Sequence, residues 1–469
     1  MTAVPAGAPA AAGAETVQDA VRQLAGFVAE LTYDTLPAPV LDRLPVMLTD
    51  LLGVTIAGNR TPEMRAVLAA WRSEPGTRPV LGTDAAFGAE QAALLNAAGA
   101  CCLELDEGNK HAQGHPAVHV VFAALAAAQL QGETVSGQRF LTAVAAGYEV
   151  AARFGQAMTR HPDWHPHGHW GATGAACAAA LISGLPASRV AAAMDAAAGL
   201  VNAAPWQLVL DGNFTRNFWA GGANLAGLHA ARLSAAGVVG NSGAAAAVLG
   251  GLAGTLEPTA LVRDLGTDWL LSRGYSKLHS SCSFTHGAVD LALELREETA
   301  DRSGVVSVDS IDQIRVITHS LAAPLFGIQP DNRLSGMFSY PFVLSVALLQ
   351  GEVTPATMDP EHPGAGPART LAEKVTVQAS PEYDALLPGE RRSCLEIRWA
   401  NGRVSRAESP NPRGDADFHP LDAAGVQAKL SALLSARSAQ RVAGVVHRLP
   451  DAADTAGAFT DLQFEGDPT

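Results

Sequence analysis

Apolar side chains recur at helical spacing through the first 270 residues of the chain. The clearest case is the run Val17, Val21 and Leu24, which follows a polar residue suited to cap a helix. The same spacing predicts helices over residues 41–57, 63–71, 90–98, 118–130, 137–154, 171–182, 187–198, 217–236 and 244–253. We therefore predict an unbroken series of helices in this part of the chain.

The pattern changes near residue 275, where β-branched residues begin to alternate with polar ones. This alternation predicts strands over residues 311–318, 375–379, 394–399 and 404–408. Asn401-Gly402 lies between the last two runs and is a strong signal for a hairpin turn. Helical spacing predicts two helices between the strands, over residues 282–298 and 339–350, and returns over residues 422–434.

These changes of pattern predict a mainly α protein with two domains. We expect a large all-helical domain over residues 15–272 and a smaller α+β domain over residues 273–409. Residues 410–469 are expected to return to the helical domain, and residues 1–14 to form a flexible tail.

The composition indicates how such helices pack. Hydrophobic residues make up 48 % of the chain, aromatic residues only 6 %, and there are 46 glycines. Small residues on helix faces, such as Gly221, Gly222, Ala226 and Ala230, allow helix axes to approach closely. The ample apolar surface excludes a disordered chain, and 5 cysteines without a CxxC pair exclude a disulfide scaffold.

The charge balance and the length of the apolar runs exclude two further classes. The chain has 46 acidic against 32 basic residues and no dense basic run, so we expect no nucleic-acid partner. No window reaches the roughly 18 apolar residues of a membrane span, so we expect no membrane partner. The chain starts without the basic residues of a secretory signal, and we expect a cytoplasmic protein.

A first polar cluster, residues 103–116, interrupts two apolar helices and combines carboxylates with histidines. Pro116 suits the first turn of a helix, which places His115 at the helix start. The helix dipole there lowers the pKa of an imidazole. A neutral histidine near Glu104 or Asp106 is a candidate general acid or base. The alternative is a polar surface loop with a capping histidine.

A second cluster, residues 161–171, contains four histidines and two tryptophans before an Ala-rich helix. His165, His167 and His169, together with Asp106, would supply enough ligands for a metal ion if they converged. The cluster lacks an HExxH or CxxC frame, so we expect no metal. We favour anion binding or acid/base chemistry, and a structural loop is the alternative.

A third cluster places one isolated cation at the start of an apolar helix. Arg216 lies there, and a guanidinium suits a two-bond grip on a carboxylate. The alternative is a surface arginine that pairs with Asp211.

A fourth cluster, residues 274–286, begins with a lysine and continues with serines. Ser280, Ser281 and Ser283 would cap the following helix and leave backbone N–H groups free for an anion, with Lys277 just upstream. Cys282 near a histidine would also allow nucleophilic catalysis, which we regard as the weaker alternative.

The four clusters, in this order, resemble the MmgE/PrpD family over residues 17–436. The matching elements are Glu104–Glu107 with His115-Pro116, Gly147-Tyr148-Glu149-Val150, Trp164-His165 with residues 171–176, Lys277 with Cys282, His286 and Asp290, Phe338–Phe342, and Gly414-Asp415 with Pro420-Leu421. Each element alone is of modest specificity. Six in the family's order identify the chain as a member.

The resemblance implies a large all-helical domain, a smaller α+β lid domain and an active site in the cleft between them. It also implies a homodimer and no organic cofactor. The family includes 2-methylcitrate dehydratase, cis-aconitate decarboxylase and iminodisuccinate epimerase. It therefore implies a lyase or isomerase that moves a proton at a carbon next to a carboxylate of a di- or tricarboxylic acid.

Carried over onto this chain, the resemblance assigns roles to the polar clusters. We expect His115 and His165 to form the acid/base pair, and Asp106 to orient a histidine or act as a base, with Glu104 as second choice. Lys277 would help to stabilise an enediolate-like charge. The expected substrate-binding residues are Glu104, Asn109, His167, Arg216, Ser280, Ser281, Cys282, His286, Tyr340 and Phe342.

Four positions depart from the family's usual residues. Arg216 stands where a lysine is common, Phe342 where a tyrosine is common, His167 where a threonine is usual, and Gly108 where many members have threonine or serine. We expect a dehydratase, possible alternatives being a decarboxylase or an epimerase. A non-catalytic dicarboxylate-binding protein or a metal protein built on the histidine loop forms a different class that stays open.

Overall fold

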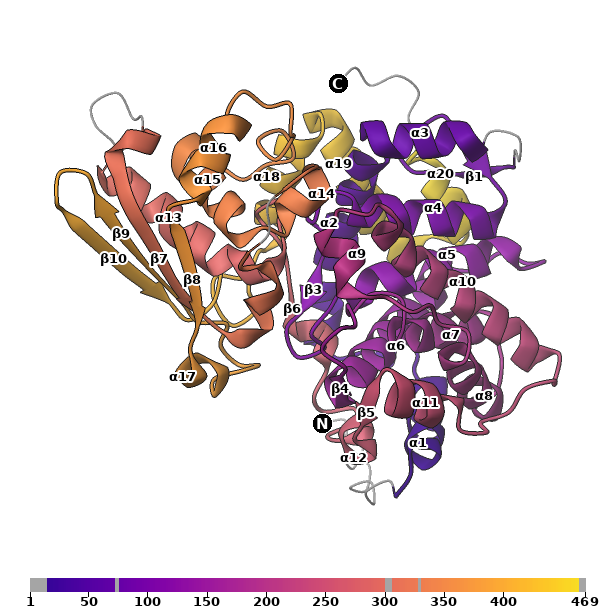
Figure 1. The fold of residues 1–469 in the computed structure, drawn as a ribbon. Helices are drawn as coiled ribbons and strands as arrows, with labels where there is room; N and C mark the ends of the chain where they lie inside the picture. The colour runs from indigo at the N-terminus through magenta and orange to yellow at the C-terminus, as the bar shows by residue number, and fades with distance from the viewer. Residues whose placement is uncertain (1–14, 72–75, 300–305, 328–329, 464–469) are drawn as a thin grey trace, which may run out of the picture.

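The computed structural model describes residues 15–71, 76–299, 306–327 and 330–463. A large helical part, drawn mostly in indigo to magenta, lies beside a smaller part that carries the orange strands (Figure 1). We call these parts the helical body and the sheet region (residues 282–409). The prediction of a mainly α fold is confirmed, and the predicted tail, residues 1–14, lies outside the described residues.

The helical body consists of closely packed helices and a few short paired strands. Its helices are α1 (Val17–Ala29), α2 (Ala38–Asn59), α3 (Pro62–Trp71), α4 (Ala89–Cys101), α5 (Pro116–Leu130), α6 (Gly137–Ala157), α7 (Gly171–Ile182), α8 (Ala187–Ala198), α9 (Trp206–Leu210), α10 (Thr215–Ala235), α11 (Ala244–Ala247) and α12 (Pro258–Val262). Antiparallel strand pairs join β1 (Arg78–Pro79) to β2 (Ala86–Phe87), β3 (Gly108–Asn109) to β6 (Gly274–Tyr275), and β4 (Met158–Arg160) to β5 (Gly254–Leu256).

Small residues let the central helices approach closely, as the composition predicts. Gly147 on α6 faces Gly174 on α7, and a Cβ added to Gly174 would lie 2.3 Å from the Gly147 carbonyl oxygen. Gly221 on α10 faces α4 in the same way, since an added Cβ would lie 2.6 Å from the Leu94 carbonyl oxygen. Only glycine fits at these two crossings, because backbone atoms cannot yield as a flexible side chain can.

The sheet region is built on one four-stranded sheet with the strand order β10-β9-β7-β8. β7 pairs parallel to β8, and the other two pairs are antiparallel. Its strands are β7 (Ile311–Thr318), β8 (Val375–Ala379), β9 (Ser393–Trp399) and β10 (Val404–Ser409), and its helices are α13 (His286–Thr299), α14 (Arg333–Met337), α15 (Tyr340–Gln350), α16 (Ala365–Ala372) and α17 (Pro381–Asp384). α13 and α15 pack against this sheet and share a hydrophobic core with it.

The last part of the chain lies against the helical body. Helices α18 (Ala423–Leu433) and α19 (Ala436–Arg448) pack on α2, and α20 (Thr455–Thr460) packs on α5. Val426, Leu430 and Val442 are buried in the same core as the first helices. Figure 1 accordingly shows the yellow helices beside the indigo ones.

Two predicted helices are shorter than the apolar pattern suggested. The helix predicted over residues 244–253 ends at Ala247, and Val248–Leu252 form a wider π-helical turn that contains two glycines. The helix predicted from residue 282 begins at His286, after a 3₁₀ turn at Ser283–Thr285. Backbone hydrogen bonds to the rest of the sheet region hold the segment before that turn, as described below.

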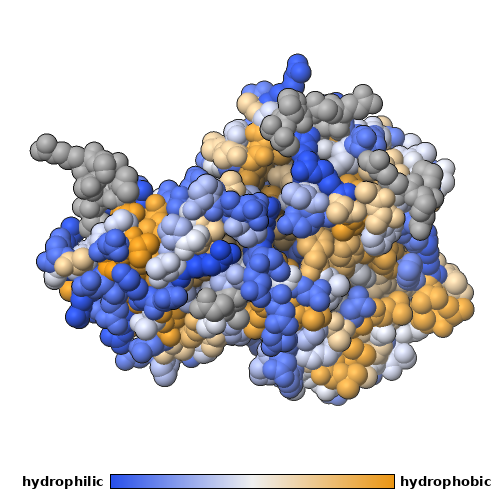
Figure 2. Space-filling model, turned by 45° about the horizontal axis from the view of Figure 1, so that its top comes forward, coloured by the Kyte–Doolittle hydropathy of each residue, from blue (hydrophilic) through white to orange (hydrophobic). Residues whose placement is uncertain are grey.

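Hydrophobic residues on the molecular face in Figure 2 form separate patches among hydrophilic ones. Among the described residues, no helix combines the length and the apolar character needed to cross a membrane.

Replacing Gly174 with alanine should destabilise the protein by about 2 kcal/mol, because the added methyl group would overlap the Gly147 carbonyl group. Gly26→Ala in α1 is the matched control, since an added Cβ there meets no atom within 4 Å. The control should be neutral or stabilising by up to about 1 kcal/mol. Thermal unfolding of the three proteins measures both effects, and equal midpoints would contradict the packing argument.

Candidate active site

A narrow cavity forms where the four polar clusters of the sequence meet. It lies between the helical body and the sheet region. Its walls are formed by Glu104, Gln113, Gly114, His115, His165, Pro166, Trp206, Arg216, Tyr275, Cys282, Ser283, Phe284, Phe338 and Arg391. Five of the predicted site residues line it directly, namely Glu104, His115, His165, Arg216 and Cys282.

Glu104 stands at the centre of a buried ion-pair cluster beside this cavity. One carboxylate oxygen pairs with Arg216, and the other lies 3.0 Å from Lys277 Nζ. All three side chains are at most 1 % exposed. Glu104 has a left-handed backbone (φ 52°), which turns its carboxylate to the cavity while Leu103 and Leu105 enter the hydrophobic core.

Asp106 links the ion-pair cluster to His115. Its Oδ1 lies 3.6 Å from Lys277 Nζ and its Oδ2 lies 3.2 Å from His115 Nδ1. Burial alone would raise the pKa of the Asp106 carboxyl, but His115 and Lys277 hold that pKa below its ordinary value. In turn, Glu104 and Asp106 raise the pKa of Lys277 against the effect of burial. Asp106 is therefore an anion and Lys277 a cation at neutral pH.

His115 begins α5, as Pro116 at the first helical position predicts. Its Nδ1 lies 2.7 Å from the Glu107 carbonyl oxygen. A carbonyl oxygen only accepts hydrogen bonds, so Nδ1 must carry a proton. In the neutral imidazole, Nε2 is then the unprotonated nitrogen, available to accept a proton from a molecule in the cavity.

His165 has the opposite arrangement. Its Nδ1 accepts a hydrogen bond from the backbone N–H of His167 at 3.2 Å, so the proton of the neutral ring is on Nε2. Burial and the charge of Arg216 lower the pKa of His165 well below its usual value. His165 is therefore neutral at pH 7 and offers a hydrogen-bond donor, while His115 offers an acceptor.

His119 connects the two histidine loops, and the sequence analysis did not single it out. Its Nδ1 donates to the His115 carbonyl oxygen at 2.7 Å, and its Nε2 accepts from the backbone N–H of Gly168 at 3.1 Å. Burial lowers the pKa of His119 to about 4, so it stays neutral. Its position one helical turn after His115 is the signal that could have identified it.

His167 and Asn109 lie beside the cavity without lining it. The His167 ring packs against those of His115 and His165, at centroid distances of 4.9 and 4.6 Å. Asn109 Nδ2 donates to the Leu270 carbonyl oxygen at 2.7 Å, which ties the loop to the segment before β6. In this structure both residues support the site rather than face its cavity.

The N–H groups of Ser280 and Ser281, expected to be free at the fourth cluster, are already bonded. The backbone N–H groups of Ser280, Ser281 and Cys282 donate to the carbonyl oxygens of Val353, His279 and Met337. These bonds leave none of the three for an anion. Burial raises the pKa of the Cys282 thiol to about 11, so a nucleophilic thiolate is disfavoured as well.

Three further predicted residues lie away from the cavity wall. His286 Nε2 donates to the Ser281 carbonyl oxygen at 3.2 Å, and its ring packs on His279. Tyr340 and Phe342 belong to the hydrophobic core of the sheet region. Phe338, two positions before Tyr340, is the aromatic residue of this segment that lines the cavity, and its ring lies 5.3 Å from the Arg216 guanidinium carbon.

Among the residues that the structure describes, Asp106, His115 and His167 form one group with the ligand types of a metal site. Their ligand atoms lie within 4.8 Å of one another. However, Lys277 lies 3.6 Å from Asp106 and Arg216 pairs with the neighbouring Glu104, so two positive charges stand close to this group, which opposes a metal cation. The donor set suits an anionic substrate better than a metal ion.

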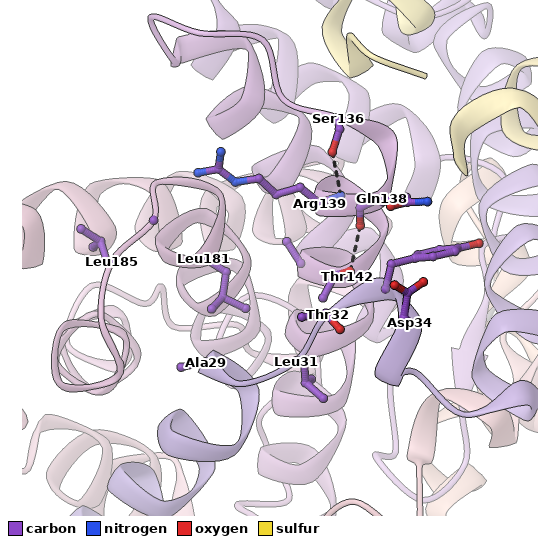
Figure 3. A pocket seen from close by; sticks show the side chains of 13 residues that line it. Ala29, Leu31, Thr32, Asp34, Ser136, Gln138, Arg139, Thr142, Leu181 and Leu185 are labelled. Carbon is purple, nitrogen blue, oxygen red and sulfur yellow. Dashed lines mark hydrogen bonds between the residues drawn. The ribbon is translucent and has the colours of Figure 1, made fainter. Parts of the chain in front are cut away.

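A second and wider hollow lies between α6 and α7 and the segment that follows α1 (Figure 3). Arg139 lines this hollow; its side chain pairs with Glu133 and donates a hydrogen bond to the Ile182 carbonyl oxygen. The hollow holds no group of histidines and carboxylates like that of the narrow cavity. The narrow cavity is therefore the candidate active site.

Comparison with known proteins places the chain in one family. The MmgE/PrpD N-terminal domain matches residues 22–262, and the MmgE/PrpD C-terminal domain matches residues 279–449. The chain belongs to the MmgE/PrpD family.

Curated relatives match over most of their length. A cis-aconitate decarboxylase-like protein from Aspergillus oryzae is 28 % identical over 393 residues, which cover 77 % of this chain and 80 % of the relative. A cis-aconitate decarboxylase from Aspergillus terreus is 25 % identical over 388 residues, covering 77 % and 79 %. The similarity therefore extends over both the helical body and the sheet region.

Replacing Glu107 with glutamine should flatten the pH dependence of stability. Burial raises the pKa of this carboxyl to about 8, and it hydrogen-bonds Tyr148. An unfolded glutamate ionises near pH 4.3, roughly. The contribution of the protonated Glu107 carboxyl to the stability of the folded state is therefore complete below the pKa of the unfolded glutamate. It is lost as the pH rises to about 8.

Glutamine does not titrate, so the unfolding midpoint of wild type minus that of Glu107→Gln should fall from pH 5 to pH 8. Thermal unfolding across this range measures the difference. A difference that is constant with pH would contradict the raised pKa.

Proposed function

We propose that this protein is a lyase that moves a proton at a carbon next to a carboxylate of a di- or tricarboxylic acid. The observation that carries the proposal is the opposed protonation of His115 and His165 beside a buried cluster of cations. A proton acceptor and a neutral hydrogen-bond donor facing one cavity suit the formation and protonation of an enediolate-like intermediate. The family and the named relatives support the same class of reaction.

In this proposal His115 Nε2 exchanges the proton with the substrate carbon. The positive charge that develops on the imidazole is stabilised by Asp106, whose Oδ2 lies 3.2 Å from Nδ1. This arrangement follows the logic of a carboxylate that orients and stabilises a catalytic histidine.

His165 takes the complementary role in the proposal. Its Nε2–H donates a hydrogen bond to the oxygen on which negative charge develops, and Arg216 adds its positive charge from the same cavity wall. A neutral imidazole with a lowered pKa serves well as such a donor, as in enzymes that polarise a carbonyl group. These steps need only protons and charges, so the proposal includes no organic cofactor.

The site favours a one-base reaction over an epimerisation. Inversion at carbon requires an acid/base group on each face of the substrate, and the low pKa of His165 makes it a poor base. Loss of CO₂ requires carboxylate positioning and a proton for the carbon that loses CO₂, which a His115 ring protonated at Nε2 would supply. Loss of water requires removal of a proton from carbon and protonation of the leaving hydroxyl. Decarboxylation is favoured by the names of the relatives, and dehydration remains the second candidate.

Two structural expectations belong to the same proposal. The sheet region would act as a lid, because it contributes Phe338 and Phe284 to the wall of a cavity whose histidines come from the helical body. The family resemblance further implies a homodimer.

The reaction class can be tested with cis-aconitate, citrate and 2-methylcitrate in D₂O. Proton NMR would follow deuterium incorporation and alkene signals, and released CO₂ would be measured in parallel. CO₂ release identifies a decarboxylase, and interconversion of hydroxy and unsaturated acids identifies a dehydratase. No conversion and no exchange with any acid that binds would favour a non-catalytic binding protein.

On the substrate found in this way, His115→Asn should lower kcat by about 10²- to 10⁴-fold, because it removes the proton acceptor. His165→Asn should lower kcat by about 10²-fold, because it removes one donor to the developing charge. His161→Asn is the matched control, since this side chain is 54 % exposed and lies outside the cavity wall. Near-normal turnover in both cavity variants would contradict the proposal.

A further inference from the structure

Arg391 is a buried cation of the cavity wall that was not apparent from the sequence. The residue is only 5 % exposed, and it reaches the cavity from the loop before β9 in the sheet region. Among the described residues, no carboxylate lies within ion-pair distance of its guanidinium group. Since a buried charge without a counter-charge is costly, the site is incomplete until an anion enters it.

The loop that carries Arg391 is held firmly in place. The Arg391 backbone N–H donates to Asn411 Oδ1 at 2.9 Å. Two residues earlier, the Gly389 carbonyl oxygen accepts from Lys110 Nζ at 2.9 Å and from Asn411 Nδ2 at 3.2 Å. Lys110 comes from the helical body, so these bonds fix the arginine relative to both parts of the molecule.

The guanidinium group is oriented by aromatic rings and one hydroxyl. Its central carbon lies 5.3 Å from the Tyr275 ring centroid and 5.5 Å from that of Phe284. Nη1 donates to Ser283 Oγ at 3.3 Å. These neutral contacts hold the side chain without compensating its charge, which keeps the planar group available for a carboxylate.

The charges of the other cavity cations are already compensated. Arg216 and Lys277 are balanced by Glu104 and Asp106, so this group of four is neutral overall. Arg391 adds one positive charge to the same cavity.

We propose that Arg391 forms a second carboxylate subsite, which binds a substrate carboxylate other than the one next to the reacting carbon. Ser283 and the rings of Tyr275 and Phe284 shape this subsite. The inference rests on the proposed function and deepens it, because it makes the preferred substrate an acid with at least two carboxylates held from opposite parts of the molecule.

Calorimetric titration with propane-1,2,3-tricarboxylate tests the subsite without requiring turnover. Arg391→Gln should weaken binding by about 10- to 100-fold, because a charge-assisted hydrogen-bond pair is lost. Arg392→Gln is the matched control, since Arg392 pairs with Glu390 and Glu408 outside the cavity wall. The control should bind the acid as the wild type does.

Equal binding by Arg391→Gln and wild type, or no binding by wild type, would overturn the subsite. If Arg391→Gln fails to fold, Arg391→Lys keeps the charge but lacks the planar fork. It should still bind several-fold more weakly than wild type, and unchanged binding would again overturn the inference.

The two proposals fail in distinguishable ways. Wild type that binds the tricarboxylate through Arg391 but converts no acid would contradict the proposed lyase and leave the subsite standing. An active enzyme whose KM is unchanged by Arg391→Gln would contradict the subsite and leave the lyase standing.

Discussion

The site depends on the pairing of one buried carboxylate, that of Glu104, with two cations from distant parts of the chain. Arg216 comes from the start of α10 and Lys277 from the segment after β6. Removing any partner would leave an uncompensated charge in a dry interior, so the three segments are held in one arrangement. This requirement explains how loops without regular structure can form a cavity with fixed walls.

The same cluster sets the protonation of the groups around it. His115 and Lys277 keep Asp106 ionised, and the positive charge of Arg216 adds to burial in lowering the pKa of His165. Backbone groups then determine which nitrogen of each ring carries the proton, since a carbonyl oxygen can only accept and an N–H can only donate. The histidines differ in role because their backbone neighbours differ, although both rings are buried in the same cavity wall.

Regular periodicity made much of the fold predictable from the sequence. The apolar spacing anticipated α5, α7 and α10, the alternation anticipated β7 and β9, and Pro116 fixed the start of α5 at His115. The family resemblance added the order of the polar clusters, and the cavity indeed draws residues from all four.

The remaining errors come from contacts that no local pattern encodes. Ser280 and Ser281 were expected to offer free N–H groups, but the Ser280 N–H donates to the distant Val353 carbonyl oxygen and the Ser281 N–H to that of His279, two residues earlier. In the segment 338–342, the helix start turns Tyr340 and Phe342 into the core and leaves Phe338 at the cavity. Arg391 was missed because it stands in a charged run, Glu390-Arg391-Arg392, that is typical of an exposed loop.

When both imidazole rings are neutral, His115 Nε2 is a hydrogen-bond acceptor and His165 Nε2 is a hydrogen-bond donor. The direct measurement is nitrogen-15 NMR of protein with labelled histidines at pH 7, with the two rings assigned by His115→Asn and His165→Asn. The account predicts a proton on Nδ1 of His115 in its neutral form and on Nε2 of a neutral His165. The same tautomer for both rings, or a protonated His165 at this pH, would contradict it.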